Sequence, residues 1–242
     1  MKKYLFANWK MNKNVKEAKE FTNALEKNDQ EENEIVICPS SIALQSLNEF
    51  KKEKNIKLAS QNISSKEEGA LTGELAATQV KEFCEYVICG HSERRYYFGE
   101  SDKLIGEKVR MVLKEDMIPV ICVGETLAEK KIGQTEEVVG SQLDIIFKDV
   151  SEQDQEKFLI VYEPRWAIST AADNFGEADT PANAEAVAKI IKKKYPKTTV
   201  IYGGSVDPNN IENFLKMPNI SGALVGGASL EVGKFNSMTK LL

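Results

Sequence analysis

The chain has 242 residues, of which 42% are hydrophobic and 29% are charged, so it can bury a sizeable core and does not read as a disordered polar chain. A net charge of −5 argues against nonspecific binding to nucleic acid or to an anionic membrane. No apolar run reaches the roughly 18 residues of a membrane span, and the apolar stretch behind the first three residues is too short for a signal peptide. We therefore expect a cytoplasmic protein with no nucleic-acid partner and no membrane partner.

Short apolar runs alternate with longer amphipathic segments along the whole chain. The predicted strands are residues 4–9, 34–38, 57–61, 86–90, 118–123, 159–163, 198–202 and 223–225. The predicted helices are residues 15–25, 41–52, 77–83, 103–115, 136–147, 181–194, 208–215 and 235–241. The strands are nearly continuous apolar runs, which is typical of a parallel sheet buried on both faces.

Two architectures fit eight strand–helix units, namely an open doubly wound sheet and a closed (β/α)8 barrel. The count of eight, a length near the roughly 250 residues typical of barrels and the lack of Gly-x-Gly-x-x-Gly after the first strand favour the barrel. No shift in composition marks a second domain. The prediction is an α/β protein, one TIM barrel domain spanning residues 1–242.

The chain has few residues of the types that can bind metal ions or form disulfides. Four cysteines, at positions 38, 84, 89 and 122, form no Cys-x-x-Cys pair and read as reduced, mostly buried thiols. His91 is the only histidine, so a His-rich metal site is impossible, and no acidic cluster has the spacing of a calcium loop. The sequence therefore predicts neither of these two kinds of metal site.

Chemically active residues gather where the predicted strands end, and in a barrel the C-terminal strand ends face one shared site. Glu163 closes the sixth strand, because Pro164 has no N–H with which to continue the ladder. Asn8 and Lys10 end the first strand, and His91 and Glu93 follow the fourth. Taken alone, the glutamate could cap or ion-pair, the lysine could lie on the surface and the histidine could be structural.

Two Gly-Gly turns follow the seventh and eighth strands, at 203–204 and 226–227. Glycine lets backbone N–H groups approach a phosphate closely, and barrel enzymes often bind phosphate at these loops, although two tight turns would look the same. Combined with this cradle, Lys10, His91 and Glu163 supply a cation, a hydrogen-bonding electrophile and a base. That set suits proton abstraction beside a carbonyl, with stabilisation of the enediolate oxygen.

Seven phrases in these regions resemble the triosephosphate isomerase family, in order and across essentially the whole chain. They are Ala7-Asn-Trp-Lys-Met-Asn12, Gly69-Ala-Leu-Thr-Gly-Glu74, Gly90-His-Ser-Glu-Arg-Arg95, Cys122-Val-Gly-Glu-Thr126, Tyr162-Glu-Pro-Arg-Trp-Ala-Ile168, Tyr202-Gly-Gly-Ser-Val206 and Leu224-Val-Gly-Gly-Ala-Ser-Leu230. The resemblance implies a (β/α)8 barrel that interconverts dihydroxyacetone phosphate and glyceraldehyde 3-phosphate without cofactor or metal.

The resemblance also implies a role for each matching residue. Glu163 would shuttle the proton, neutral His91 would polarise the carbonyl, and Lys10 would stabilise negative charge and help to hold the phosphate. The pairing of a carboxylate base with a neutral histidine is the known pattern of that family, so it comes with the resemblance. Asn8 would hydrogen-bond near the substrate oxygens and Glu93 would support the site. The phosphate-binding positions would be Ser169, Ser205, Gly226 and Gly227.

A homodimer is implied as well, with the loop at residues 69–74 reaching into the partner and Thr72 near the partner's site. The residues alone indicate only that a loop spanning residues 62–74 is long enough to suspect binding or assembly.

The lid after Glu163 departs from the family pattern. Residues 169–172 read Ser-Thr-Ala-Ala where Gly-Thr-Gly-Lys is usual, and Asp173 to Asp179 look like an insertion. Arg165 stands where a small apolar residue is usual. Because hinge changes often alter kcat and KM together, we expect retained activity with altered lid closure.

Two other functions remain possible from the sequence. One is a barrel that binds a sugar phosphate without turnover, which only the altered lid supports. The other is a pentulose-phosphate epimerase, which shares the glycine loops but would typically need metal ligands that one histidine hardly supplies.

Overall fold

Eight parallel strands form a closed barrel in the computed structural model, which describes residues 2–168 and 179–242. Each strand pairs with its neighbours in chain order, and β1 closes the ring against β8, with Ala7 opposite Val225. The strands are β1 (Tyr4–Asn8), β2 (Glu34–Cys38), β3 (Lys57–Ser60), β4 (Tyr86–Cys89), β5 (Ile118–Val123), β6 (Leu159–Tyr162), β7 (Thr199–Tyr202) and β8 (Gly222–Val225). The closed order confirms the predicted (β/α)8 barrel and excludes the open sheet.

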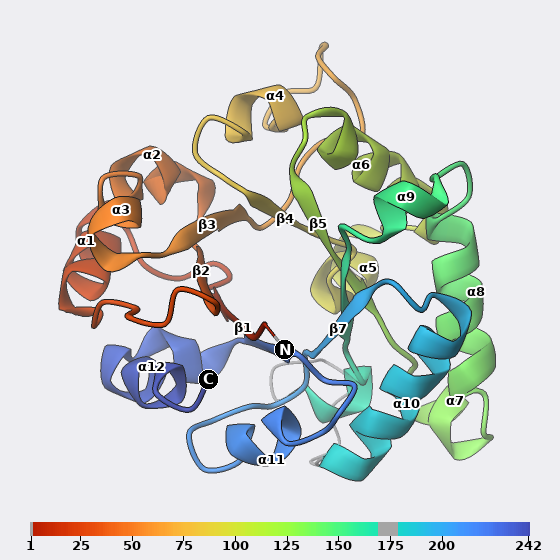
Figure 1. Cartoon of the computed structure of the whole chain (residues 1–242). Coiled ribbons are helices and arrows are strands. Elements are labelled where there is room, and N and C mark those ends of the chain that lie inside the picture. The colour runs from red at the N-terminus through yellow and green to blue at the C-terminus, as the bar shows by residue number, and fades with distance from the viewer. Residues whose placement is uncertain (1, 169–178) are drawn as a thin grey trace.

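Helices surround the strands in a ring (Figure 1). The α-helices are α1 (Val15–Ala24), α2 (Leu44–Leu47), α3 (Phe50–Lys54), α4 (Ala77–Val80), α5 (Ser92–Phe98), α6 (Asp102–Lys114), α7 (Leu127–Lys131), α8 (Thr135–Ile146), α9 (Glu152–Gln155), α10 (Pro181–Lys194), α11 (Ile211–Leu215) and α12 (Val232–Thr239). Three short 3-10 helices are η1 (Ser41–Ala43), η2 (Arg165–Ala167) and η3 (Gly227–Leu230). Among the described helices, none is both long enough and apolar enough to cross a membrane.

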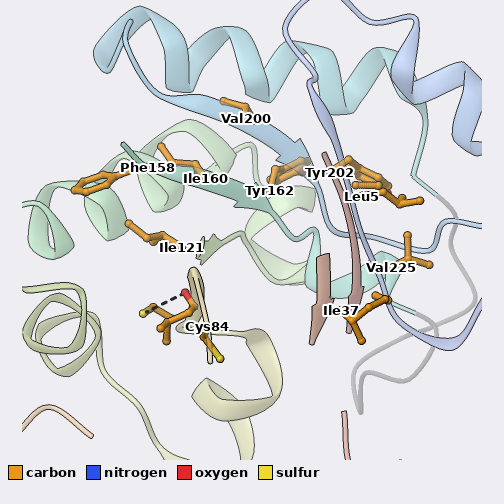
Figure 2. Packing of buried hydrophobic residues seen from close by; sticks show 14 of the residues in the cluster. Leu5, Ile37, Cys84, Ile121, Phe158, Ile160, Tyr162, Val200, Tyr202 and Val225 are labelled. Atoms are coloured by element: carbon orange, nitrogen blue, oxygen red, sulfur yellow. Dashed lines mark hydrogen bonds between the residues drawn. The ribbon is translucent and has the colours of Figure 1, made fainter. Parts of the chain in front are cut away.

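Alternate residues of each strand pack on opposite sides of the barrel wall. The smaller apolar cluster fills the interior, with members such as Phe6, Val120 and Val161. The larger cluster lies between strands and helices and includes Leu5, Ile121 and the other residues labelled in Figure 2. Since both faces are buried, the strands read as continuous apolar runs rather than as alternating ones.

Helix starts follow local capping chemistry. The Asn14 side chain accepts from the backbone N–H of Glu17, whose carboxylate accepts in return from the Asn14 N–H. Thr180 caps α10 and is followed by Pro181, which suits the first helical position because its missing N–H would have no helical partner there. These signals are readable from the sequence, and α10 has the predicted bounds.

Four predicted helices differ from the observed ones by more than one residue at an end, and one of them, predicted at 235–241, is α12 and runs from Val232 to Thr239. The segment at 41–52 is three short helices, because i→i−3 bonds such as Asn48 N–H to Gln45 O interrupt the α pattern. Helix α11 starts at Ile211 rather than at 208, since the Asp207 carboxylate accepts from the N–H groups of the next residues and forms a turn there. The helix predicted at 77–83 ends at Val80. The sequence did not predict α5, α7 and α9.

Candidate active site

Alternate residues of each strand point into the barrel interior. The same alternation determines which side chains at the C-terminal end of the barrel point inward. Leu159 and Val161 belong to the interior cluster, so Glu163, two residues further on, continues the inward row. Phe6 is likewise interior, so Asn8 and Lys10 continue the inward row of β1. The polar side chains at the ends of β1 and β6 therefore both point toward the barrel axis, because every second residue of a strand faces the same side.

His91 reaches the same site by a different route. The interior row of β4 runs through Tyr86 and Ile88, so the next inward position is Gly90. Gly90 has a φ of +72°, and a Cβ there would lie 2.7 Å from Cδ1 of Ile105. This left-handed backbone conformation ends the inward–outward alternation of β4. His91 follows as the N-cap of α5.

Glu163 and His91 meet at the barrel end. Oε1 of Glu163 lies 3.0 Å from Nε2 of His91, and both side chains are buried. The other carboxylate oxygen accepts from the Ser92 N–H at 3.0 Å. Nδ1 of His91 accepts from the Glu93 N–H at 3.2 Å, which leaves Nε2 as the ring nitrogen that can donate toward the pocket.

Lys10 is held by polar contacts on both its backbone and its side chain. Its ammonium pairs with Oε1 of Glu93 at 2.6 Å, and its N–H donates to Oδ1 of Asn8 at 3.1 Å. Its carbonyl accepts from the Gln61 amide at 2.9 Å. These contacts hold Lys10 at a φ of +53°, a region that non-glycine residues rarely occupy.

These side chains share a pocket of about 290 Å³ with the two Gly-Gly turns. The pocket is lined by Asn8, Lys10, His91, Glu163, Ile168, residues 203–207, Asn210, Leu224 and residues 226–228. Backbone N–H groups of the glycine turns and the fixed cation of Lys10 are suited to an anion. The imidazole of His91 and the carboxylate of Glu163 line the same pocket, so it can hold a small phosphorylated carbonyl compound beside a base.

The sequence-predicted residues are not all in this pocket. Glu93 lines the adjacent hollow and reaches the site through Lys10. Thr72 is exposed on the loop between β3 and α4, which projects from the barrel (Figure 1), and does not line the pocket. Ser169 and the residues to 178, with most of the apparent insertion, lie outside the described part of the chain.

A buried carboxylate, Glu125, supports the segment after Glu163. Its Oε1 accepts from the Tyr162 hydroxyl and from the indole N–H of Trp166, both at 3.1 Å. Burial and the nearby carboxylate raise the pKa of Tyr162, which keeps its hydroxyl a donor. The ammonium of Lys130 lies 3.3 Å from the Trp166 ring centroid, a cation–π contact. Trp166, three residues after Glu163, is thereby held by Glu125, which lies between β5 and α7, and by Lys130 on α7.

At the other end of the lid, Asp179 precedes the cap of α10. Its Oδ1 accepts from the Thr180 N–H and from the Asn183 amide, both at 2.8 Å. Its Oδ2 is buried and has no hydrogen-bond partner among the described residues. Burial raises the pKa of Asp179 from 3.8 to about 6.

The sequence reasoning overlooked two residues that shape the site. Gln61 follows β3 directly, so the strand-end rule applied to the third strand would have found it. Asn210 lines the pocket and donates to the Ser205 carbonyl at 3.1 Å, but it lies in a turn that no strand period marks. Within residues 2–168 and 179–242, no group of three or more His, Cys, Asp or Glu side chains could hold a metal ion.

Comparison with known proteins agrees with this geometry. The family model described as triosephosphate isomerase matches residues 3–242. The chain is 42% identical to the triosephosphate isomerase of Mycoplasma capricolum, with 95% of this chain and 94% of that protein covered. It is 40% identical to those of Endomicrobium trichonymphae and Aquifex aeolicus, with 99% and 97% of both chains covered. A barrel with these strand-end side chains and a family match over nearly its whole length belongs to the triosephosphate isomerase family, which interconverts dihydroxyacetone phosphate and glyceraldehyde 3-phosphate.

Proposed function

We propose that Glu163, His91 and Lys10 carry out the isomerisation of triose phosphate in this chain, as a step of glycolysis and gluconeogenesis. The observation that carries the assignment is the single pocket that joins these three side chains to the two Gly-Gly turns. A base, a neutral donor and a cation then surround one small phosphorylated substrate.

The reaction moves one proton between neighbouring carbons. The carboxylate of Glu163 takes a proton from the carbon beside the carbonyl, and the C–H electron pair forms the C=C bond of an enediolate. The Nε2–H of His91 donates to the carbonyl oxygen as negative charge develops there, and Lys10 stabilises the same charge. His91 passes its Nε2 proton to this oxygen and takes up the proton of the hydroxyl on the carbon that lost its hydrogen, so that this second oxygen becomes the new carbonyl. Protonated Glu163 then returns its proton to the carbon that carried the first carbonyl, which completes the isomerisation.

The contacts between His91, Glu163 and Ser92 define what the substrate must displace. Nε2 of His91 now faces Oε1 of Glu163 at 3.0 Å, so a substrate oxygen takes the place of this carboxylate oxygen. Oε2 must likewise leave the Ser92 N–H to reach the substrate carbon. Substrate binding is therefore coupled to a movement of the Glu163 side chain.

The phosphate occupies the opposite end of the pocket. Backbone N–H groups of Gly226 and Gly227 and the residue Ser205 bind its oxygens, Lys10 adds its charge, and Asn8 contacts the substrate oxygens. Ser169 would add an N–H from the lid, as any non-proline residue can.

A coupled assay with glyceraldehyde 3-phosphate tests the proposal directly. We expect cofactor-free turnover in the presence of a metal chelator and competitive inhibition by inorganic phosphate. A protein that binds phosphate without turnover would be a sugar-phosphate-binding barrel instead.

We further propose that the chain is a homodimer. Met11 and Phe98 are 98% and 67% exposed and line the hollow beside Lys10 and Glu93, which favours a protein surface covering them. The loop that carries Thr72 projects from the barrel, as an arm that contacts a second copy would (Figure 1). Sedimentation equilibrium should give twice the chain mass, and Thr72→Arg should lower both this mass and the activity. A fully active monomer would contradict the proposal.

The four buried, unpaired cysteines support a reducing compartment, and we place the protein in the cytoplasm. We also propose that residues 1–242 form a single domain, since β1 pairs with β8 across the chain.

A further inference from the structure

The segment that joins β1 to α1 holds two non-glycine residues in the left-handed region. Lys10 has a φ of +53° and Lys13 a φ of +67°. Residues in this region carry a backbone strain and persist where surrounding contacts determine them. Contacts to Asn8, Glu93 and Gln61 account for Lys10, whereas the proposed reaction gives Lys13 no part.

Lys13 is a partly buried lysine with a defined partner. Its Nζ donates to the carbonyl oxygen of Leu230 at 2.8 Å, 217 residues away in the chain. The ammonium also lies 4.8 Å from the ring centroid of Phe21 and 5.5 Å from that of Trp9. Burial lowers the pKa of Lys13. A lysine with a merely solvated head group would have none of these contacts.

Leu230 ends the turn whose beginning forms the phosphate side of the pocket. That turn is η3, and Gly226 and Gly227 at its start line the pocket. The turn is rigid within itself, because the N–H and hydroxyl of Ser229 both donate to the Gly226 carbonyl, at 2.9 and 2.7 Å. A contact that fixes Leu230 therefore also fixes the N–H groups at the other end of the turn.

The β1–α1 segment and η3 also meet inside the pocket. A Cβ placed on Gly226 would lie 3.3 Å from Cε and 3.6 Å from Nζ of Lys10. Lys10 thus lies against the start of the turn while Lys13 holds its end. The same short segment supplies the charge at the phosphate site and the bond that sets the distance between the two walls.

We propose that Lys13 is a positioning residue for phosphate binding, acting through its bond to the Leu230 carbonyl. It holds η3 against the β1–α1 segment, so that the N–H groups of residues 226–227 and the ammonium of Lys10 meet one phosphate group. This inference rests on the proposed function and adds to it a residue that touches no substrate.

The test compares Lys13→Met, Lys13→Gly and Lys13→Arg with the unaltered protein. Methionine keeps the apolar stem over the two rings and bears the same left-handed backbone cost, so it removes only the charge and the donor. Glycine relieves the backbone cost and keeps the test valid if the methionine variant folds poorly. Arginine retains a cationic donor.

Binding of inorganic phosphate is measured by calorimetry, and kcat and KM by the coupled assay. For Lys13→Met and Lys13→Gly we expect the phosphate dissociation constant to rise roughly 2- to 30-fold, the range for residues that couple to a site without touching its ligand. KM should rise in the same ratio and kcat should change by a smaller factor. Arginine should restore most of the affinity.

Lys3→Met is the matched control. Lys3 is also partly buried, burial also lowers its pKa, and its ammonium donates to the Leu215 and Ile220 carbonyls at 2.9 and 3.0 Å, but it precedes β1 at the opposite end of the barrel. This variant should lose stability without losing phosphate affinity.

Two results distinguish a failure of the role of Lys13 from a failure of the proposed function. If both Lys13→Met and Lys13→Gly bind phosphate within twofold of the unaltered protein, Lys13 is only structural and the inference is overturned. If the unaltered protein binds phosphate but does not isomerise glyceraldehyde 3-phosphate, the proposed function fails while the phosphate titrations still decide the role of Lys13.

Discussion

Nε2 of His91 and Oε1 of Glu163 lie 3.0 Å apart, although β4 and β6 are separated in the barrel by β5. Both side chains are buried at the end of the barrel. Two different features of the backbone bring them together. Glu163 continues the inward-facing residues of β6, and the left-handed conformation of Gly90 turns the chain after β4.

Glu163→Gln should abolish most turnover, because an amide cannot accept the substrate proton. General-base catalysis typically contributes roughly 100- to 10,000-fold, and we expect kcat to fall by at least this factor. The amide carbonyl can still accept from the Ser92 N–H, so phosphate affinity and thermal stability should change little. Glu212→Gln, on α11 with an exposed carboxylate, is the control for charge removal. Near-complete activity in Glu163→Gln would refute the assignment of the base.

Lys10→Met tests the fixed cation. Loss of one preorganised donor at a developing oxyanion typically costs roughly 100- to 1,000-fold in kcat, and the missing charge should also raise KM. Lys16→Met, which removes a lysine whose side chain is 83% exposed, should leave both constants unchanged. Equal kinetics for the two variants would show that the charge of Lys10 is not used.

Gly124→Ala should unfold the end of β5. A Cβ on Gly124 would lie 1.9 Å from the Glu163 carbonyl oxygen, so the two segments would have to separate. We expect a loss of roughly 1–3 kcal/mol in unfolding free energy, measured by denaturant titration, together with loss of activity.

The matched control, Gly140→Ala, lies within α8, where an added Cβ meets no atom within 4 Å. It should stabilise the protein by roughly 0.5–1 kcal/mol, because alanine restricts the unfolded chain. Similar stability for the two variants would mean that the close approach of Gly124 to the Glu163 carbonyl does not require a glycine.

Asp179→Asn should stabilise the protein in a pH-dependent manner. Burial raises the pKa of Asp179 to about 6, so between about pH 4 and pH 6 the folded state holds a proton that the unfolded chain has released. The contribution of this carboxyl to stability therefore falls as pH rises through that window. The advantage of the variant should be small near pH 4 and reach roughly 1–3 kcal/mol at pH 7, measured by urea titration at each pH.

Asp144→Asn provides the opposite case. Hydrogen bonds from Lys194 and Tyr195 lower the pKa of Asp144, so its charged form stabilises the fold above about pH 4 and this contribution is lost as pH falls further. This variant should be less stable than the unaltered protein between pH 5 and pH 7. A flat difference for Asp179→Asn over the same range would contradict the burial argument.

Short-range patterns in the sequence were sufficient for the barrel and for part of the site. Eight apolar runs separated by amphipathic segments predicted the strands, and period 2 already places Glu163 on the inward row with Leu159 and Val161. The amphipathic pattern predicted α10 with the observed bounds, and the cap by Thr180 with Pro181 behind it explains locally why the helix starts there. These features depend on neighbours within a few residues.

Other features depend on residues far apart in the chain, and only the tertiary structure decided them. The sequence contains Gly124 and Lys13, but the need for the first comes from the Glu163 carbonyl and the contact of the second lies 217 residues away. The sequence likewise could not show that Gln61 holds the Lys10 carbonyl. The sequence by itself therefore determined the fold class, the family and which residues stand at the strand ends, because these follow from local periodicity and motif. The closed barrel decided which of those residues meet and what holds them, because closing the ring brings distant strand ends within hydrogen-bonding distance.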